Sequence, residues 1–196
     1  MTPIKTHTRE YLERLIATLE AMPVEAIERL SETLYRAYTD GKQVFILGNG
    51  GSASTASHMA ADLGKNTIGP NMRRFRIMSL NDNIPMLTAL SNDLGYENVF
   101  AEQLQSLIQP GDVLIVLSGS GNSPNVIKAM EYARSQSAEV AALLGFGGGR
   151  AAELADISIL VDSSDYGVVE DAHLVLNHIL VEYFQQRLAD ENPWSA

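Results

Sequence analysis

The sequence contains no cysteine, and this absence limits the chemistry open to the protein. Without cysteine there is no disulfide framework, no thiol nucleophile and no thiolate metal site. Long apolar runs are also absent: none approaches the ~18 residues that a membrane-spanning helix needs, and the first 15 residues lack the apolar core of a signal peptide. We therefore expect a soluble, cytoplasmic protein without a membrane partner.

Basic residues are scarce as well. The chain has 14 Lys and Arg against 24 Asp and Glu, a net charge of −10, and only residues 73–76 are locally basic. Binding of nucleic acid relies on clustered cations against phosphates, so this balance argues against a nucleic-acid partner. At 196 residues with 45% hydrophobic residues, the chain is typical of one globular domain, and we expect residues 1–196 to form it.

Five short apolar segments indicate buried strands, and helical patterns lie between them. The predicted strands are 43–47, 75–80, 112–117, 140–144 and 157–161. The predicted helices between and after them are 53–64, 85–90, 96–107, 124–136, 151–155 and 167–188, with a break at 91–95. Buried strands that alternate with helices are typical of a parallel sheet covered on both faces. The sequence thus predicts an α/β core over residues 41–190.

Two amphipathic helices, 8–22 and 24–39, are predicted ahead of the first strand, within residues 1–40. They stand outside the strand–helix alternation, and two interpretations are open: they cover the sheet, or they form a subunit interface. We favour an oligomerisation role, because an apolar stripe of this length has to be buried somewhere.

The first strand is followed by a glycine-rich turn, Gly48-Asn49-Gly50-Gly51-Ser52, and then by a helix. A strand, such a turn and a helix N-terminus form an anion site, since free backbone N–H groups converge there. The turn matches neither the P-loop nor the dinucleotide fingerprint. His58 and Asp62 follow four residues apart, on one face of the helix. The alternative is an ordinary turn with His58 as a packed core residue.

A second turn, Ser118-Gly119-Ser120-Gly121-Asn122-Ser123, joins the third strand to a helix that begins near Pro124. Its three hydroxyls and the helix N–H groups can surround one phosphate without a lysine, although a serine-rich turn without a ligand is the alternative. The last long helix carries Glu170, His173 and His178, and the first and last of these can face one region of the fold.

Four segments together resemble the sugar isomerase (SIS) domain family, and more narrowly its phosphoheptose isomerases. They are GNGGSA followed by a helical histidine, NDLGYENVF, GDVLIVLSGSGNSPNVIKA and EDAHLVLNHIL. The resemblance covers nearly the whole chain, including the two leading helices. It implies a five-stranded parallel sheet flanked by helices, and a homotetramer with active sites at subunit interfaces. It also implies isomerisation of sedoheptulose 7-phosphate to D-glycero-D-manno-heptose 7-phosphate through an enediol.

The resemblance also implies roles for individual residues. Asp62 would be the catalytic base and His178 its partner. One zinc ion per active site would be held by His58, Asp62, Glu170 and His178; without zinc, His178 would be the proton shuttle. The implied substrate-binding residues are Asn49, Gly50, Ser52, Asp93, Ser118, Gly119, Ser120, Ser123 and Glu170.

Three positions depart from the family pattern. The family usually has Glu where this chain has Asp62, Gln where it has Glu170, and Thr where it has Gly119. Asp62 is one methylene shorter and has to lie closer to the substrate, whereas the carboxylate of Glu170 would strengthen binding of a divalent cation. These changes bear on the substrate more than on the type of reaction.

Two non-enzymatic interpretations stand beside the isomerase. One is a sugar-phosphate sensor; the other is a partner-binding protein, like a relative that assists the bacterial replication initiator. In such relatives, the family suggests, titratable groups on the two helices are lost. This chain keeps His58, Asp62, Glu170 and His178, which favours the enzyme.

Overall fold

A computed structural model of the chain describes residues 3–69 and 73–190. Its centre is one sheet of five parallel strands in the order β2-β1-β3-β4-β5, which confirms the predicted fold class. The strands are β1 (Gln43–Gly48), β2 (Arg76–Ser79), β3 (Val113–Ser118), β4 (Glu139–Leu144) and β5 (Ile157–Leu160). Each end of every strand lies within one residue of its prediction.

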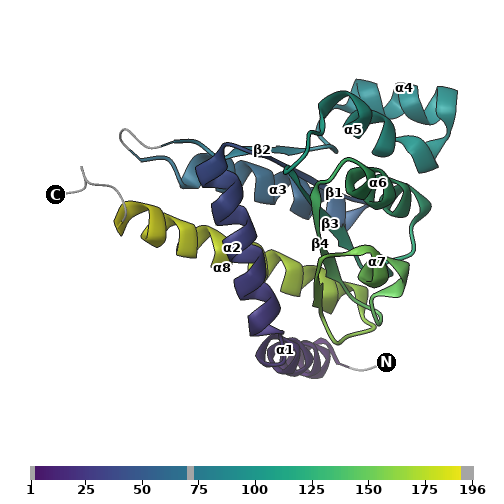
Figure 1. The fold of residues 1–196 in the computed structure, drawn as a ribbon. Helices are drawn as coiled ribbons and strands as arrows, with labels where there is room; N and C mark the ends of the chain where they lie inside the picture. Colours follow the sequence, from purple (N-terminus) through teal and green to yellow (C-terminus); the bar gives the residue numbers. More distant parts are fainter. Residues whose placement is uncertain (1–2, 70–72, 191–196) are drawn as a thin grey trace.

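Side chains that alternate along the strands supply two apolar cores. In β1, Val44 and Ile46 pack with α2 (Val24–Asp40), α3 (Gly51–Asn66) and α8 (Tyr166–Asp190) on one face of the sheet. Phe45 and Leu47 pack on the other face, which the remaining core helices cover. These are α4 (Ile84–Leu94), α5 (Ala101–Leu107), α6 (Pro124–Ser135) and α7 (Gly149–Leu154). Figure 1 shows α3 and α8 on the opposite side of the strands from α6 and α7.

The segment between β2 and β3 differs from its prediction. Helix α4 continues to Leu94, so the predicted break at 91–95 is wrong. The polar residues at 92 and 93 are exposed and do not interrupt the helix, which ends where Gly95 takes a positive φ of 89°. The predicted helix 96–107 is likewise divided into a 3-10 turn, Tyr96–Asn98, and α5. The turn directs Val99 and Phe100 into the core, where both are fully buried.

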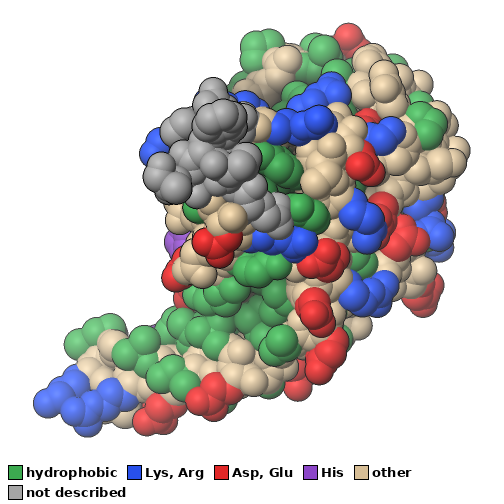
Figure 2. Space-filling model, turned by 60° about the vertical axis from the view of Figure 1, so that its left-hand side comes forward, with side chains coloured by type: hydrophobic (Ala, Val, Ile, Leu, Met, Phe, Trp, Pro, Cys, Tyr) green, Lys and Arg blue, Asp and Glu red, His purple; other side chains and the backbone are tan. Residues whose placement is uncertain are grey.

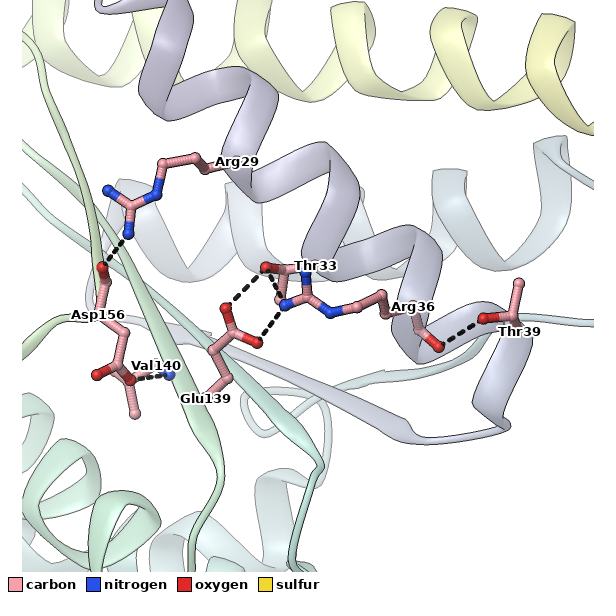
Figure 3. Close-up of polar contacts among 7 residues, drawn as sticks. All are labelled: Arg29, Thr33, Arg36, Thr39, Glu139, Val140 and Asp156. Carbon is pink, nitrogen blue, oxygen red and sulfur yellow. Dashed lines mark hydrogen bonds and ion pairs between the residues drawn. The ribbon is translucent and has the colours of Figure 1, made fainter.

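Helix α2 is fixed to the sheet by polar contacts as well as by apolar packing (Figure 3). The Arg29 guanidinium donates to the Asp156 carbonyl at 2.7 Å, ahead of β5. Thr33 and Arg36 each donate to one oxygen of the Glu139 carboxylate at 2.8 Å, at the start of β4. With Leu30 and Leu34 fully buried, the inner face of α2 covers the sheet. The alternative of a cover over the sheet is therefore correct for this face.

Helix α1 (Ile4–Glu20) behaves differently, because none of its residues is buried. It lies against α8 and extends from the body as an arm (Figures 1 and 2). The Tyr11 hydroxyl donates to the Asp171 carboxylate at 2.6 Å, and this bond raises the pKa of Tyr11 to about 12. Ile4, Leu12 and Ile16 are all exposed. Their apolar surface has no cover within the described part of the chain.

None of the helices in the described ranges is apolar over a length that would cross a membrane. The cellular location stays a prediction.

The strand order places two turns side by side. Strands β1 and β3 are neighbours, and the chain order of the strands reverses between them. In open parallel sheets, ligands bind in the crevice at the carboxyl ends of strands at such a switch point. The turn after β1 and the turn after β3 both lie there, which makes this edge the expected ligand site.

Candidate active site

A cavity of about 270 Å³ lies at this edge, between the two turns and the start of α8. The turn after β1, the turn after β3 and residues Tyr166 and Glu170 line it. Of the nine predicted substrate-binding residues, all except Asp93 are among the lining residues. Asp93 is exposed on α4, where its carboxylate accepts a hydrogen bond from Asn92.

The turn after β3 is held in a fixed shape by its own hydrogen bonds. Ser118 Oγ accepts from the Gly121 N–H at 3.0 Å, and Ser120 Oγ accepts from the Asn122 N–H at 3.3 Å. Gly121 has a φ of 64°, and a Cβ there would overlap the Gly148 carbonyl, so this position requires glycine. Ser123 precedes α6 but makes no side-chain capping bond. Its hydroxyl is therefore available to an anion at the start of α6, where Pro124 has no N–H and the Val126 N–H already donates to Asn125 Oδ1.

The turn after β1 is tied to the turn after β3 through an amide pair. Asn49 and Asn125 donate to each other's side-chain oxygens, both at 2.9 Å. The Tyr96 hydroxyl also donates to Asn49 Oδ1, at 2.8 Å. Sequence reasoning missed Asn125 and Tyr96, because only strand pairing brings them to Asn49. Together these contacts fix the distance between the two turns.

Glu170 reaches the cavity from α8. A Cβ at Gly51 would overlap the Glu170 carboxylate, so only glycine allows this close approach to the start of α3. A carboxylate near a helix N-terminus is stabilised by the free N–H groups and the dipole. The neighbouring lining residue, Tyr166, packs its ring on that of Phe146 at 4.4 Å between centroids. Tyr166 was also missed from the sequence, where it belongs to no motif.

A second group of side chains lies further along α3 and α8. His58 Nε2 lies 3.1 Å from Asp62 Oδ2, and His178 Nε2 lies 3.9 Å from the same oxygen. The two imidazole rings are 5.3 Å apart and nearly perpendicular. The histidine side chains are about half exposed, whereas that of Asp62 is 19% exposed. The structure thus brings together both predicted catalytic residues and His58.

This group fits a divalent metal ion. One ligand atom from each of the three residues lies within 4.8 Å of the other two. Two ligand atoms on one tetrahedral zinc lie roughly 3.3 Å apart, close to the observed 3.1 Å between His58 and Asp62. Two imidazoles and one carboxylate, with a face open to solvent, resemble zinc sites that keep one position free. Glu170 is outside this group, because its carboxylate lies against Gly51.

His173 lies on α8 between Glu170 and His178 but faces the core. It is 1% exposed, and neither ring nitrogen has a hydrogen-bond partner within standard geometry. Burial lowers the pKa of His173 to about 4, with a smaller opposing effect from the backbone carbonyl of Leu144. His173 is therefore neutral at pH 7 and lies apart from the cavity.

Comparison with protein families gives the class of the protein. The SIS domain model matches residues 8–145, more than half of the chain, and the chain belongs to the SIS domain family. A phosphoheptose isomerase of Helicobacter pylori is 38% identical over 185 residues, covering 94% of this chain and 93% of that protein. One from Trichlorobacter lovleyi is 35% identical over 89% of this chain and 88% of that protein. Within the SIS domain family, the chain falls among the phosphoheptose isomerases.

Solved structures agree with this assignment. The phosphoheptose isomerase of Neisseria gonorrhoeae superimposes with a TM-score of 0.85 at 28% identity, covering 94% of this chain and 100% of that one. The enzyme of Francisella tularensis gives the same TM-score at 26% identity, covering 93% and 96%. The sugar isomerase domain of an RpiR transcription factor from Sphaerobacter thermophilus, at 21% identity, shares the fold alone.

Proposed function

We propose that the protein is a ketose–aldose isomerase that converts sedoheptulose 7-phosphate to D-glycero-D-manno-heptose 7-phosphate. The observation that carries the proposal is the joint presence of a phosphate cavity and an acid–base group in one fold. The cavity holds Ser118, Ser120 and Ser123, and the group holds Asp62 and His178. The names of the relatives support the same reaction.

The reaction needs two proton transfers on carbon and two on oxygen. The Asp62 carboxylate would take the proton from C1 of the ketose while the C2 carbonyl oxygen gains one, which gives the enediol. Loss of the proton from the C1 hydroxyl and return of a proton to C2 then produce the aldose. His178, within 3.9 Å of Asp62 and half exposed, would move protons between the two oxygens. All atoms balance without an external reagent.

The position of the two parts along α3 bears on the substrate. Ser52 in the cavity and Asp62 are ten residues apart on this helix, about 15 Å along its axis. A ligand held by its phosphate in the cavity needs reacting carbons several bonds from that phosphate. C1 and C2 of sedoheptulose 7-phosphate lie at the opposite end of the carbon chain from the C7 phosphate, so different residues can hold the phosphate and the reacting carbons.

We also propose one zinc ion per site, held by His58, Asp62 and His178 with a fourth position free. When bound, the ion supplies positive charge beside the oxyanion that develops during enolisation. Glu170 as a further ligand stays a prediction.

Zinc should copurify with the protein, and dialysis against a chelator should lower the turnover number, with recovery on addition of Zn²⁺. Metal analysis and activity before and after dialysis check this. A fully active, metal-free protein would contradict the zinc proposal and would leave the proposed acid–base roles of Asp62 and His178 unchanged.

One assay separates the isomerase from the two other functions. The purified protein is incubated with sedoheptulose 7-phosphate, and the aldose is followed by NMR. An isomerase gives the aldose catalytically. A sugar-phosphate sensor would bind the substrate without turnover, and a partner-binding protein would do neither.

Ser120→Ala tests the phosphate cavity. The change removes one hydroxyl that faces the phosphate, with an expected loss of about 1–3 kcal/mol of binding, which corresponds to a roughly 5–150-fold higher KM. Ser135→Ala, at the exposed end of α6, is the matched control and should retain the wild-type KM. If Ser120→Ala also has the KM of the wild type, the phosphate does not bind here.

We also propose a homotetramer with α1 and α2 in its core and active sites at the subunit interfaces. The exposed apolar surface on α1, α2 and α8 supports an interface between chains. A groove of about 380 Å³ between α2 and α8 contains Val24, Ile27, Ile179 and Tyr183. Figure 2 shows hydrophobic side chains gathered in the hollow between the arm and the body. Large exposed apolar patches of this kind mark interfaces between proteins.

Light scattering at micromolar concentration should give the mass of four chains of 21.3 kDa each. Ile16→Glu, which places a charge on the exposed apolar stripe of α1, should lower the mass, whereas Glu13→Gln should leave it unchanged. A monomeric mass for the wild type would contradict the proposed assembly.

A further inference from the structure

Two asparagine side chains hold the carboxylate of Asp62. Asn177 Nδ2 on α8 donates to Asp62 Oδ2 at 3.1 Å, and Asn66 Nδ2 at the end of α3 donates to Oδ1 at 3.1 Å. We propose that Asn177, with Asn66 in support, is a positioning residue that fixes the Asp62 carboxylate toward the two histidines. The proposal rests on the isomerase function, in which Asp62 is the base.

The geometry gives the amides this role. The oxygen that Asn177 contacts is also the oxygen that His58 and His178 approach. Rotation of a carboxylate about its last torsion is soft, so an aspartate without partners does not hold one orientation. One donor on each oxygen fixes the plane of the group. A carboxylate has about four lone-pair sites, so Oδ2 can accept from Asn177 and still face the imidazoles.

The surroundings of Asn177 favour a role in function over a role in stability. Asn177 is fully buried, and its neighbours Leu176 and Leu180 belong to the apolar core under α8. Its Oδ1 atom has no hydrogen-bond partner, and a buried oxygen without a partner is destabilising. Leucine has a similar volume and would avoid this destabilisation. A residue that breaks a packing rule without local compensation points to function, and the contact that Asn177 makes is with Asp62.

Asn66 plays the lesser part. It is partly exposed, so water can replace its amide at Asp62 Oδ1 when the side chain is removed. Water has no such access to Asn177. The structure therefore ranks the two positions: loss of Asn177 should disturb Asp62 more than loss of Asn66.

The test compares Asn177→Leu, Asn66→Ala and a control, Gln103→Leu, in the full-length protein. Asn177→Leu should lower kcat for sedoheptulose 7-phosphate by about ten- to a hundredfold, because small misplacements of a catalytic group have effects of that order. Its KM should stay within twofold and its melting temperature should not fall. Asn66→Ala should lower kcat only about threefold. Gln103 is a buried amide on the other face of the sheet, bonded to the carbonyls of Leu80 and Val99; its replacement should lower the melting temperature and leave kcat unchanged.

A double-mutant cycle shows whether the effect passes through Asp62. In the background of Asp62→Asn, Asn177→Leu should have no further effect on kcat, since the group it positions has been removed. Should leucine not be accommodated, Asn177→Ala should give the same loss of kcat with a lower melting temperature. An unchanged kcat in either variant, or full additivity in the cycle, would overturn the proposal.

A wild type without isomerase activity would be a failure of the proposed function and not of the positioning role. The NMR signals of the His58 and His178 rings then test the positioning role without turnover. Asn177→Leu should shift these signals, because Asp62 Oδ2 no longer holds its place beside the rings, and Gln103→Leu should not. Unshifted ring signals in Asn177→Leu would refute the positioning role.

Discussion

Replacing His178 by alanine is expected to lower kcat for sedoheptulose 7-phosphate by roughly a hundredfold or more, since general acid–base groups contribute on that order. The imidazole lies 3.9 Å from the Asp62 carboxylate and is 55% exposed, so it lies beside the proposed base and is open to a ligand from solvent. The turns after β1 and β3, which are proposed to bind the phosphate, do not include His178, so KM should change little. Because the side chain contributes little to the core, the variant should still fold.

The measurement is steady-state kinetics of His178→Ala beside His7→Ala, which removes an exposed histidine from α1. The control should keep wild-type kcat. Full activity in His178→Ala would show that the proton transfers depend on other residues. Loss of phosphate binding along with turnover would instead indicate that the cavity and the His58–Asp62–His178 group are one inseparable unit.

Lowering the pH from 7 to 4 is expected to remove about 3 kcal/mol of stability through His173 alone. In the unfolded chain this histidine has the ordinary pKa of 6.5, whereas burial holds it near 4 in the folded state. The unfolded state therefore binds the extra proton between these values, and stability is complete above pH 6.5 and falls as the pH drops toward 4. This difference in pKa between the two states corresponds to roughly 3 kcal/mol in the free energy of unfolding.

Urea unfolding of the wild type and of His173→Leu between pH 4 and 7 measures this contribution. Carboxylates affect both proteins equally, so the difference between the two curves isolates the histidine. His173→Leu should be no less stable at pH 7, because it removes two unpartnered nitrogens, and it should lose about 3 kcal/mol less on acidification. His7→Gln should follow the wild type. Parallel curves for the wild type and His173→Leu would show that His173 does not resist protonation in the fold.

Local patterns predicted most of the elements. Apolar runs such as 112–117 specify buried strands, because a strand covered on both faces has no polar side. The prediction failed at 91–95, where polar residues were taken as a helix break. An exposed turn of helix tolerates such residues, and the stop lies at Gly95, whose positive φ is visible only in the structure.

The candidate site divides in the same way. Local sequence was enough to predict the two glycine- and serine-rich turns and the pair His58 and Asp62, because residues four apart on a helix share a face whatever surrounds them. The roles predicted for Glu170 and Asp93 stay predictions. The carboxylate of Glu170 lies at Gly51, apart from the histidines, and Asp93 lies outside the cavity.

Contacts between residues far apart in the chain could not be predicted from local sequence. The pairing of β1 with β3 brings the two turns to one cavity and joins Asn49 to Asn125 and Tyr96. The packing of α8 on α3 places Asn177 against Asp62, 115 residues away in the chain. Such contacts depend on strand order and on the rotation of one helix against another. Strand order and helix rotation are properties of the whole fold, and the local spacing of residues does not predict them.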